Sequence, residues 1–140
     1  YLNFVQIPNM PNIPDEQKPA IGKVIAPAVL FWFRWAALAT IVTGLLLAHL
    51  QGYLLEAIQL GWADGVAKHT AIGIGMWLGA IMAFNVWFVI WPNQKKALGI
   101  VDADADTKAA SARTAMLFSR TNTLLSIPML YAMVAAQNIY

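Results

Sequence analysis

The sequence has no cysteine among its 140 residues. These residues therefore cannot form disulfides, thiolate zinc sites, cysteine-ligated iron–sulfur clusters or a covalently attached c-type haem. Any metal or haem bound here needs ligands from histidine, methionine, carboxylates or backbone oxygen. Since the chain has only two histidines, His49 and His69, these residues are the first candidates for cofactor ligands.

Charged residues are also scarce, at 11% of the chain against 59% hydrophobic residues. A soluble domain usually carries about 25% charged residues. The deficit predicts that the lipid bilayer surrounds most of the chain, which has the length of a single membrane domain, residues 1–140. The net charge is +2. Because the basic residues gather in loops on one side of the predicted membrane, we expect no nucleic-acid partner.

Three apolar stretches are long enough to cross a bilayer, which takes about 20 residues. They predict an all-α, polytopic transmembrane helix bundle. The three expected spans cover residues 28–50, 70–91 and 114–136. Pro92 is expected to end the second span, and Pro128 to kink the third. The apolar residues 1–7 indicate the tail of a fourth helix that precedes Tyr1.

The segments between the spans carry their own signals. Five prolines within residues 8–27 predict an extended, polyproline-like connector. Residues 51–69 form the expected outer loop, in which the apolar residues 53–62 predict a helix lying in the membrane interface. Residues 92–113 form the second connecting loop, and Asp106 is the expected N-cap of the third span.

Lysine and arginine are distributed unequally among these loops. Residues 8–27 and 92–113 hold six of them, whereas residues 51–69 hold only Lys68. The positive-inside rule therefore places residues 8–27 and 92–113 in the cytoplasm. Residues 51–69 and the C-terminus are then periplasmic, in a multi-pass protein of the bacterial inner membrane.

The two histidines belong to neighbouring span ends. His49 ends the first span and His69 opens the second, so antiparallel helices bring both to one depth near the outer surface. Imidazole is a common axial ligand of haem iron, and facing helices often present such pairs. This predicts a b-type haem or another metal-containing cofactor on His49 and His69, with no further metal site. Alternatively, both rings are ordinary interfacial side chains.

Polar residues also occur in the cytoplasmic half of the spans. They are Arg34, Arg120, Asn85 and Asn122, and no Asp or Glu lies within any span. Charge within a membrane is costly and by default indicates a functional site. An anion is the expected partner: a lipid phosphate, a haem propionate or an organic anion. Alternatively, both arginines extend to the interface.

The second span contains Gly73, Gly75 and Gly79, and Gly75 and Gly79 form a small-xxx-small pattern that Ala83 extends. They predict close helix packing, or the approach of a flat cofactor. The sequence shows no nucleophile–base pair, phosphate-binding glycine loop or paired carboxylates. We therefore predict no catalytic residue, and expect neither a self-contained hydrolase nor a kinase.

Several motifs resemble the membrane domain of bacterial urate hydroxylases, the urate oxidase N-terminal family. They are residues 3–8 (NFVQIP), 31–35 (FWFRW), 84–96 (FNVWFVIWPNQKK) and 119–129 (SRTNTLLSIPM). Members of that family are larger and carry a cytochrome c module. The resemblance therefore implies a truncated relative that lacks this redox module, preceded by a further helix before Tyr1.

Taken together, these patterns predict a small, non-catalytic integral membrane subunit of a larger redox or energy-converting complex, respiratory or photosynthetic. Its partners would be the lipid bilayer and the other membrane subunits, and its role would be electron transport. Two alternatives stay open. One is a structural or assembly protein without a cofactor, and the other is a urate-hydroxylase-like enzyme or organic-anion site at the intramembrane arginines.

Overall fold

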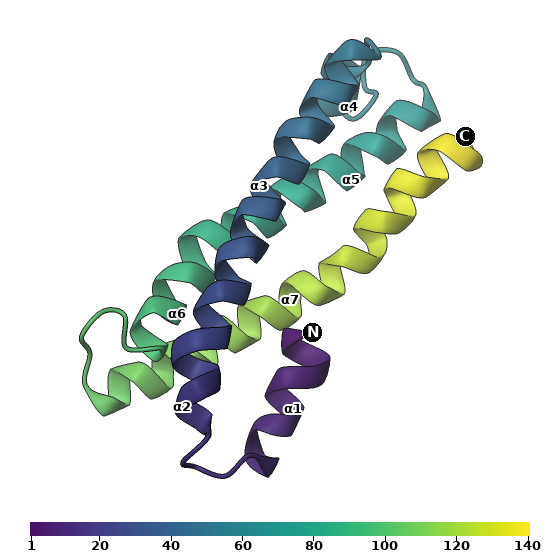
Figure 1. Cartoon of the computed structure of the whole chain (residues 1–140). Helices are drawn as coiled ribbons and strands as arrows, with labels where there is room; N and C mark the ends of the chain where they lie inside the picture. The colour runs from purple at the N-terminus through teal and green to yellow at the C-terminus, as the bar shows by residue number, and fades with distance from the viewer. The chain divides into compact units, whose positions relative to one another are not determined.

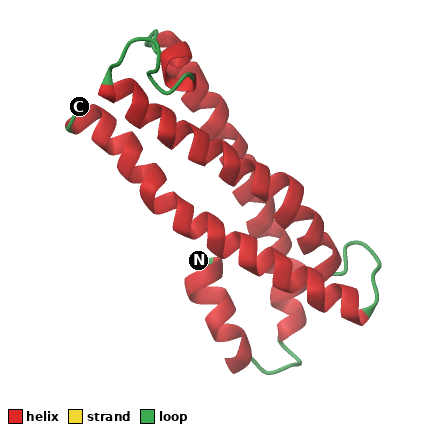
Figure 2. Cartoon of the chain, turned by 180° about the vertical axis from the view of Figure 1, so that it is seen from behind, coloured by secondary structure: helices red, strands yellow, loops and turns green.

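The computed structural model describes all residues, 1–140, and consists of helices joined by loops and turns (Figures 1 and 2). Figure 2 shows no strand, so the expected all-α class is confirmed. The chain divides into two compact units. Unit 1 comprises Tyr1–Ala36 and Val86–Arg120, and unit 2 comprises Ala37–Asn85 and Thr121–Tyr140.

The helical elements follow one another with few interruptions. In chain order they are η1 (Leu2–Gln6), α1 (Ile7–Asn9), η2 (Met10–Asn12), α2 (Lys18–Ala20), η3 (Ile21–Ile25), α3 (Ala26–Leu50), α4 (Leu54–Ile58), α5 (Ala67–Phe84), η4 (Asn85–Ile90), α6 (Trp91–Ala97) and α7 (Ala105–Asn138). Three of them, η1, η3 and η4, are π-helical, and η2 is a 3₁₀ helix.

Two continuous helices are long and apolar enough to cross a membrane. Lys18–Leu50 has 33 residues and Ala67–Ala97 has 31, so at 1.5 Å per residue both exceed the roughly 30 Å of hydrocarbon in a bilayer. Only 11% and 17% of their most apolar segments are buried. The core helix of a soluble protein would be mostly buried, so the exposure of these two helices fits lipid-facing surfaces.

The third expected span, residues 114–136, is not among these helices. It lies within α7, whose 34 residues are long enough but not apolar enough. Arg120, Asn122 and several hydroxyl side chains in α7 account for the difference. By length and composition, the structure therefore contains two candidate spans and not three.

The expected extended connector over residues 8–27 is wrong. Pro8, Pro11 and Pro19 each stand at the first or second position of a short helix. At such positions the N–H that proline lacks would have no helical partner anyway, and its fixed φ suits the helix. Proline therefore starts helical turns in this segment, and the first long helix begins already at Lys18.

Pro92 does not end the second long helix as expected. It stands at the start of α6, directly after the π-helical η4. Because Ala67–Ala97 is one continuous helix, Pro92 lies inside it at the junction of η4 and α6, and the helix continues to Ala97. Pro128 lies inside α7, which runs on to Asn138.

The N-cap of α7 also differs from the expectation. The backbone N–H of Thr107 donates to Oδ2 of Asp104 at 3.4 Å, whereas Asp106 lies within the first helical turn. The Thr107 hydroxyl, followed by its backbone N–H, holds the pKa of Asp104 below its ordinary value. Asp104, not Asp106, therefore accepts the capping bond.

Close helix contacts define unit 2. The side chains of Thr70 and Trp77 in α5 donate to carbonyl oxygens at the end of α4 and in the turn after it. Trp77 Nε1 lies 3.1 Å from Ile58 O, and Thr70 Oγ1 lies 2.8 Å from Leu60 O. Figure 1 shows α4 beside α5 in teal. A methyl group on Gly73 would clash with the carbonyl oxygen of Ala57, so glycine permits this approach.

A different face of α5, about 200° around the helix from Gly73, meets α7. A methyl group on Gly75 would lie 2.7 Å from Cγ of Met133 and 3.3 Å from the carbonyl oxygen of Met129. On Gly79 it would lie 3.6 Å from Sδ of Met129, which is an ordinary contact. The glycines therefore differ in how tightly they are packed, and Gly73, which faces backbone, is the most constrained.

Substitution of Gly73 by alanine should destabilise the fold. We expect G73A to lower the free energy of unfolding by about 1–3 kcal/mol, because backbone atoms of α4 have to move. Gly44 in α3 has nothing within 4 Å of an added methyl group, so G44A should be neutral or stabilising by up to about 1 kcal/mol. Thermal unfolding in detergent, followed by circular dichroism, distinguishes the two. Equal effects would contradict the close α4–α5 approach.

Candidate functional site

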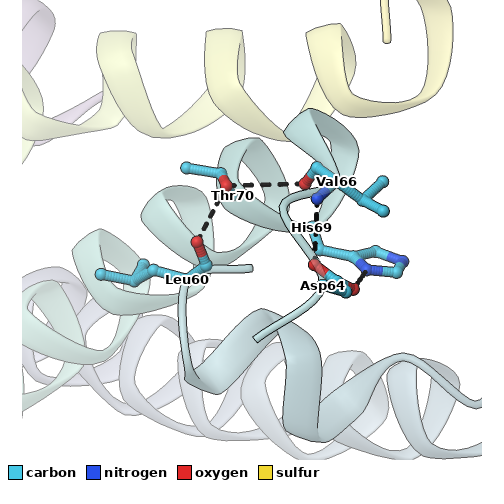
Figure 3. A network of polar contacts seen from close by, with 5 residues as sticks. All are labelled: Leu60, Asp64, Val66, His69 and Thr70. Carbon is cyan, nitrogen blue, oxygen red and sulfur yellow. Dashed lines mark hydrogen bonds and ion pairs between the residues drawn. The ribbon is translucent and has the colours of Figure 1, made fainter. Parts of the chain in front are cut away.

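His69, in the first turn of α5, is held by a carboxylate. Its Nδ1 contacts Oδ2 of Asp64 in the preceding loop, while Oδ1 of Asp64 accepts the backbone N–H of Val66 at 3.0 Å (Figure 3). The Val66 N–H, followed by His69, holds the pKa of Asp64 below its ordinary value. Because an ionised carboxylate only accepts hydrogen bonds, Nδ1 of His69 carries the proton and Nε2 is left free.

A second contact fixes the plane of the His69 ring. The ring of Tyr53 stacks on it, with 6.1 Å between centroids and 19° between planes. A small hollow of about 10 Å³ opens beside the two rings, which is room for about one water molecule. Its lining consists of Tyr53, Lys68, His69, Ile72, Ala136 and Gln137.

His49 has a different environment. It lies in the last turn of α3, its side chain is exposed, and its ring makes no hydrogen bond, ion pair or ring contact. Both histidines belong to unit 2. The sequence predicts that His49 and His69 act together as ligands, but only His69 belongs to the hydrogen-bonded network with Asp64.

Arg34 is held by aromatic rings in unit 1. Its guanidinium carbon lies 3.2 Å from the ring centroid of Trp91 and 5.8 Å from that of Trp87. Trp35 packs edge-on against Trp87, at 5.6 Å between centroids. No carboxylate pairs with Arg34, and its buried Nε has no hydrogen-bond acceptor.

The two asparagines form a bridge in unit 2. Nδ2 of Asn85 donates to Oδ1 of Asn122 at 2.9 Å, and Nδ2 of Asn122 donates to the carbonyl oxygen of Met82, also at 2.9 Å. Both asparagines are buried. Their amides therefore serve as partners for one another and for the backbone. Arg120 is exposed and makes no ion pair.

Sequence reasoning missed Asp64, Tyr53 and Trp91 as partners. Asp64 lies five residues before His69 but in a loop, where the sequence gives no periodicity from which to infer a contact. The contact of Trp91 with Arg34 depends on tertiary packing. The available signal was the occurrence of aromatic and basic residues close together in 31–35 and in 91–96.

The Nε2 atom of His69 has the chemistry of a metal ligand. The hollow beside the ring, however, is far too small to enclose a haem. A haem on Nε2 of His69 would have to lie against the outside of this chain. No group of three or more metal-ligating side chains occurs.

The helical elements, two of them apolar and exposed enough to face lipid, define the class as an all-α protein with candidate membrane-spanning helices. The sequence profile of the family described as "Urate oxidase N-terminal" matches residues 57–139, more than half of the chain. The chain belongs to this family, which confirms the resemblance found in the sequence motifs. No curated protein and no solved structure matches the sequence.

The asparagine bridge should contribute measurably to stability. Polar bridges between helices in membranes couple by about 0.6 kcal/mol on average and up to about 1.7 kcal/mol. We expect a double-mutant cycle on N85A and N122A to give a coupling energy in this range. Asn138 bonds only within its own helix and is exposed, so N138A is the control. A coupling energy of zero would contradict the bridge.

The lowered pKa of Asp64 predicts a pH dependence with a defined sign. Its contribution to stability is complete above the ordinary aspartate pKa of 3.8 and is lost as pH falls through the lower value in the folded protein. The difference in unfolding temperature between the wild type and D64N should therefore shrink below pH 3.8. Thermal unfolding of both proteins across this window measures it, and a constant difference would contradict the assignment.

Proposed function

We propose that the chain is an integral membrane unit of a larger redox complex, in which His69 serves as a ligand to a metal-containing cofactor. The observation that carries this proposal is the contact between Nδ1 of His69 and the carboxylate of Asp64. Metal-ligating histidines almost always donate their other ring N–H to a carboxylate, backbone carbonyl or water. Such a bond fixes the tautomer and makes Nε2 a stronger ligand.

The proposed cofactor is a b-type haem, whose iron supplies one-electron transfer when bound. His69 would provide one axial nitrogen, and the exposed, unpaired His49 of the same unit the second. Asp64 and Tyr53 hold the His69 ring in place. Because the hollow beside the ring holds only about one water molecule, we propose that another membrane subunit covers the cofactor. The subunit role follows from this incomplete enclosure.

We further propose that α7 completes a three-span bundle with the two apolar helices. The bond between Asn85 and Asn122 supports this, because interhelical amide bonds satisfy polar groups that lipid cannot. Residues 8–27 and 92–113 carry most of the lysines and arginines, so we propose that they face the cytoplasm of a bacterial inner membrane. Residues 51–69 and the C-terminus would then be periplasmic.

The family description favours one alternative, a urate-hydroxylase-like enzyme. In that case an organic anion would bind at Arg34, which has no carboxylate partner in the chain. Turnover of urate by the purified protein, abolished by R34Q with the helical content intact, would favour this enzyme. A structural or assembly protein predicts neither turnover nor a cofactor spectrum.

An absorption spectrum of the complex purified from native membranes tests the leading proposal. We expect a Soret band that H69A removes. D64N should weaken haem retention by about 10–100-fold, as loss of such carboxylate partners does in other metal sites. D104N removes a carboxylate that caps α7 and forms no bond with either histidine, and it should leave the band unchanged.

Two results would contradict the redox proposal. One is the absence of a Soret band in the native complex, and the other is a band of equal intensity in H69A. Circular dichroism of each variant ensures that a lost band reflects ligation and not unfolding. H49A separates the two histidines, since a band retained in that variant but lost in H69A assigns the second ligand to a residue outside this chain.

A further inference from the structure

Two cationic side chains of unit 1 share one indole ring. The guanidinium carbon of Arg34 lies 3.2 Å from the ring centroid of Trp91, and Nζ of Lys95 lies 5.7 Å from the same centroid. The two charges therefore lie within about 10 Å of each other, the screening length at 0.1 M salt. They repel each other, and the fold nevertheless keeps both at one ring.

No anion within the chain offsets these charges. The acidic side chains that form ion pairs are Asp15, with Lys18, and Asp64, with His69. The third acidic side chain with a defined role, Asp104, caps α7. Trp91 itself offers only the weak attraction of its π face, about 0.5–2 kcal/mol, so the positive charge is only partly compensated.

Hydrogen-bond donors at the same place are also unused. Nε of Arg34 and Nε1 of Trp87 are both buried without an acceptor, and Arg34 lies 5.8 Å from the Trp87 ring. A buried donor without a partner is costly, and native proteins rarely retain one. Unused donors and uncompensated charges in one cluster indicate that an oxygen-rich anion is missing.

We propose that Arg34, Lys95 and the indoles of Trp87 and Trp91 form a binding site for a phosphate group. A guanidinium fork and a lysine point charge together suit a tetrahedral oxyanion with several acceptor oxygens. The shared chemistry is a phosphate, supplied either by an anionic phospholipid headgroup or by soluble phosphate. This inference shares Arg34 with the urate-hydroxylase alternative and its membrane placement with the leading proposal, and it does not depend on a cofactor.

The contact with Trp91 also distinguishes Arg34 from an arginine that only reaches the membrane surface. An arginine that merely extends to the interface would have a mobile, hydrated head. Here the guanidinium is stacked on Trp91, and Trp35 in turn packs edge-on against Trp87. The positive group is thus fixed in place before any anion arrives, which reduces the entropy lost on binding.

Native mass spectrometry of the detergent-purified protein tests the site with phosphatidylglycerol as the probe. After delipidation and titration with this lipid, we expect R34Q to bind about tenfold more weakly and K95Q several-fold more weakly. K96Q removes the same charge from the neighbouring residue, which is exposed and contacts no ring, and it should bind as the wild type does. The K95Q result carries the test if R34Q fails to fold.

A second arm distinguishes the two sources of phosphate. Inorganic phosphate is titrated against the delipidated protein, with chloride at equal ionic strength as the control, and the unfolding temperature is recorded. A rise with phosphatidylglycerol alone assigns a lipid site, and an R34-dependent rise with inorganic phosphate assigns a soluble one. Equal lipid binding by the wild type, R34Q and K95Q, or an equal loss in K96Q, would overturn the proposal, whatever the absorption spectrum shows.

Discussion

Hydrogen bonding of a few polar groups on otherwise apolar helices is the constraint on which the rest of the structure depends. An apolar environment offers such groups no partner, so each one has to be satisfied from within the protein or by a ligand. Asn122 and Asn85 meet this requirement together, and Trp77 does so through a carbonyl at the end of α4. The contacts that satisfy these donors are also those that join α4, α5 and α7 within unit 2.

The same requirement separates the two candidate sites. Around His69 the donor on Nδ1 has found a carboxylate, and this pairing gives the ring one defined tautomer and a free Nε2. Around Arg34 the stacking partners are present but the acceptors are not. At His69 the pairing leaves Nε2 without a partner, whereas Arg34 has no anion within the chain. The two clusters would therefore suit ligands of different classes.

Much of the fold follows from the sequence, because apolar length and the absence of charge determine where long helices occur. The end of the first helix at Leu50 and the all-α class needed nothing more. The prolines were misjudged because their effect depends on their position in a helix. Pro8 and Pro19 stand at the second position of short helices, and Pro92 lies where η4 meets α6 within a continuous helix. Residues 114–136 were judged by their apolar residues, although Arg120 and Asn122 lower the average.

The candidate residues were found more easily than their partners. Scarcity alone identified His69 and Arg34, since there are two histidines in the chain and little charge in its apolar stretches. Asp64 and Trp91 could not be inferred, because a loop conformation and a tertiary contact bring them to these residues. Spacing likewise suggested one group of Arg34, Arg120 and the two asparagines, whereas the recorded partners of the asparagines are each other and Met82.

The π-helical segment η4, Asn85–Ile90, has a consequence for comparing relatives of this chain. A π turn accommodates one more residue than an α turn, and each residue advances an α-helix by about 100°. Because the wider turn absorbs the extra residue, a homologue with one residue fewer here would form a regular helix and keep the counterpart of Trp91 on the same side, one position earlier along the chain. Residue position after this segment is therefore an incomplete guide to shared chemistry, and the length of the segment has to be matched first.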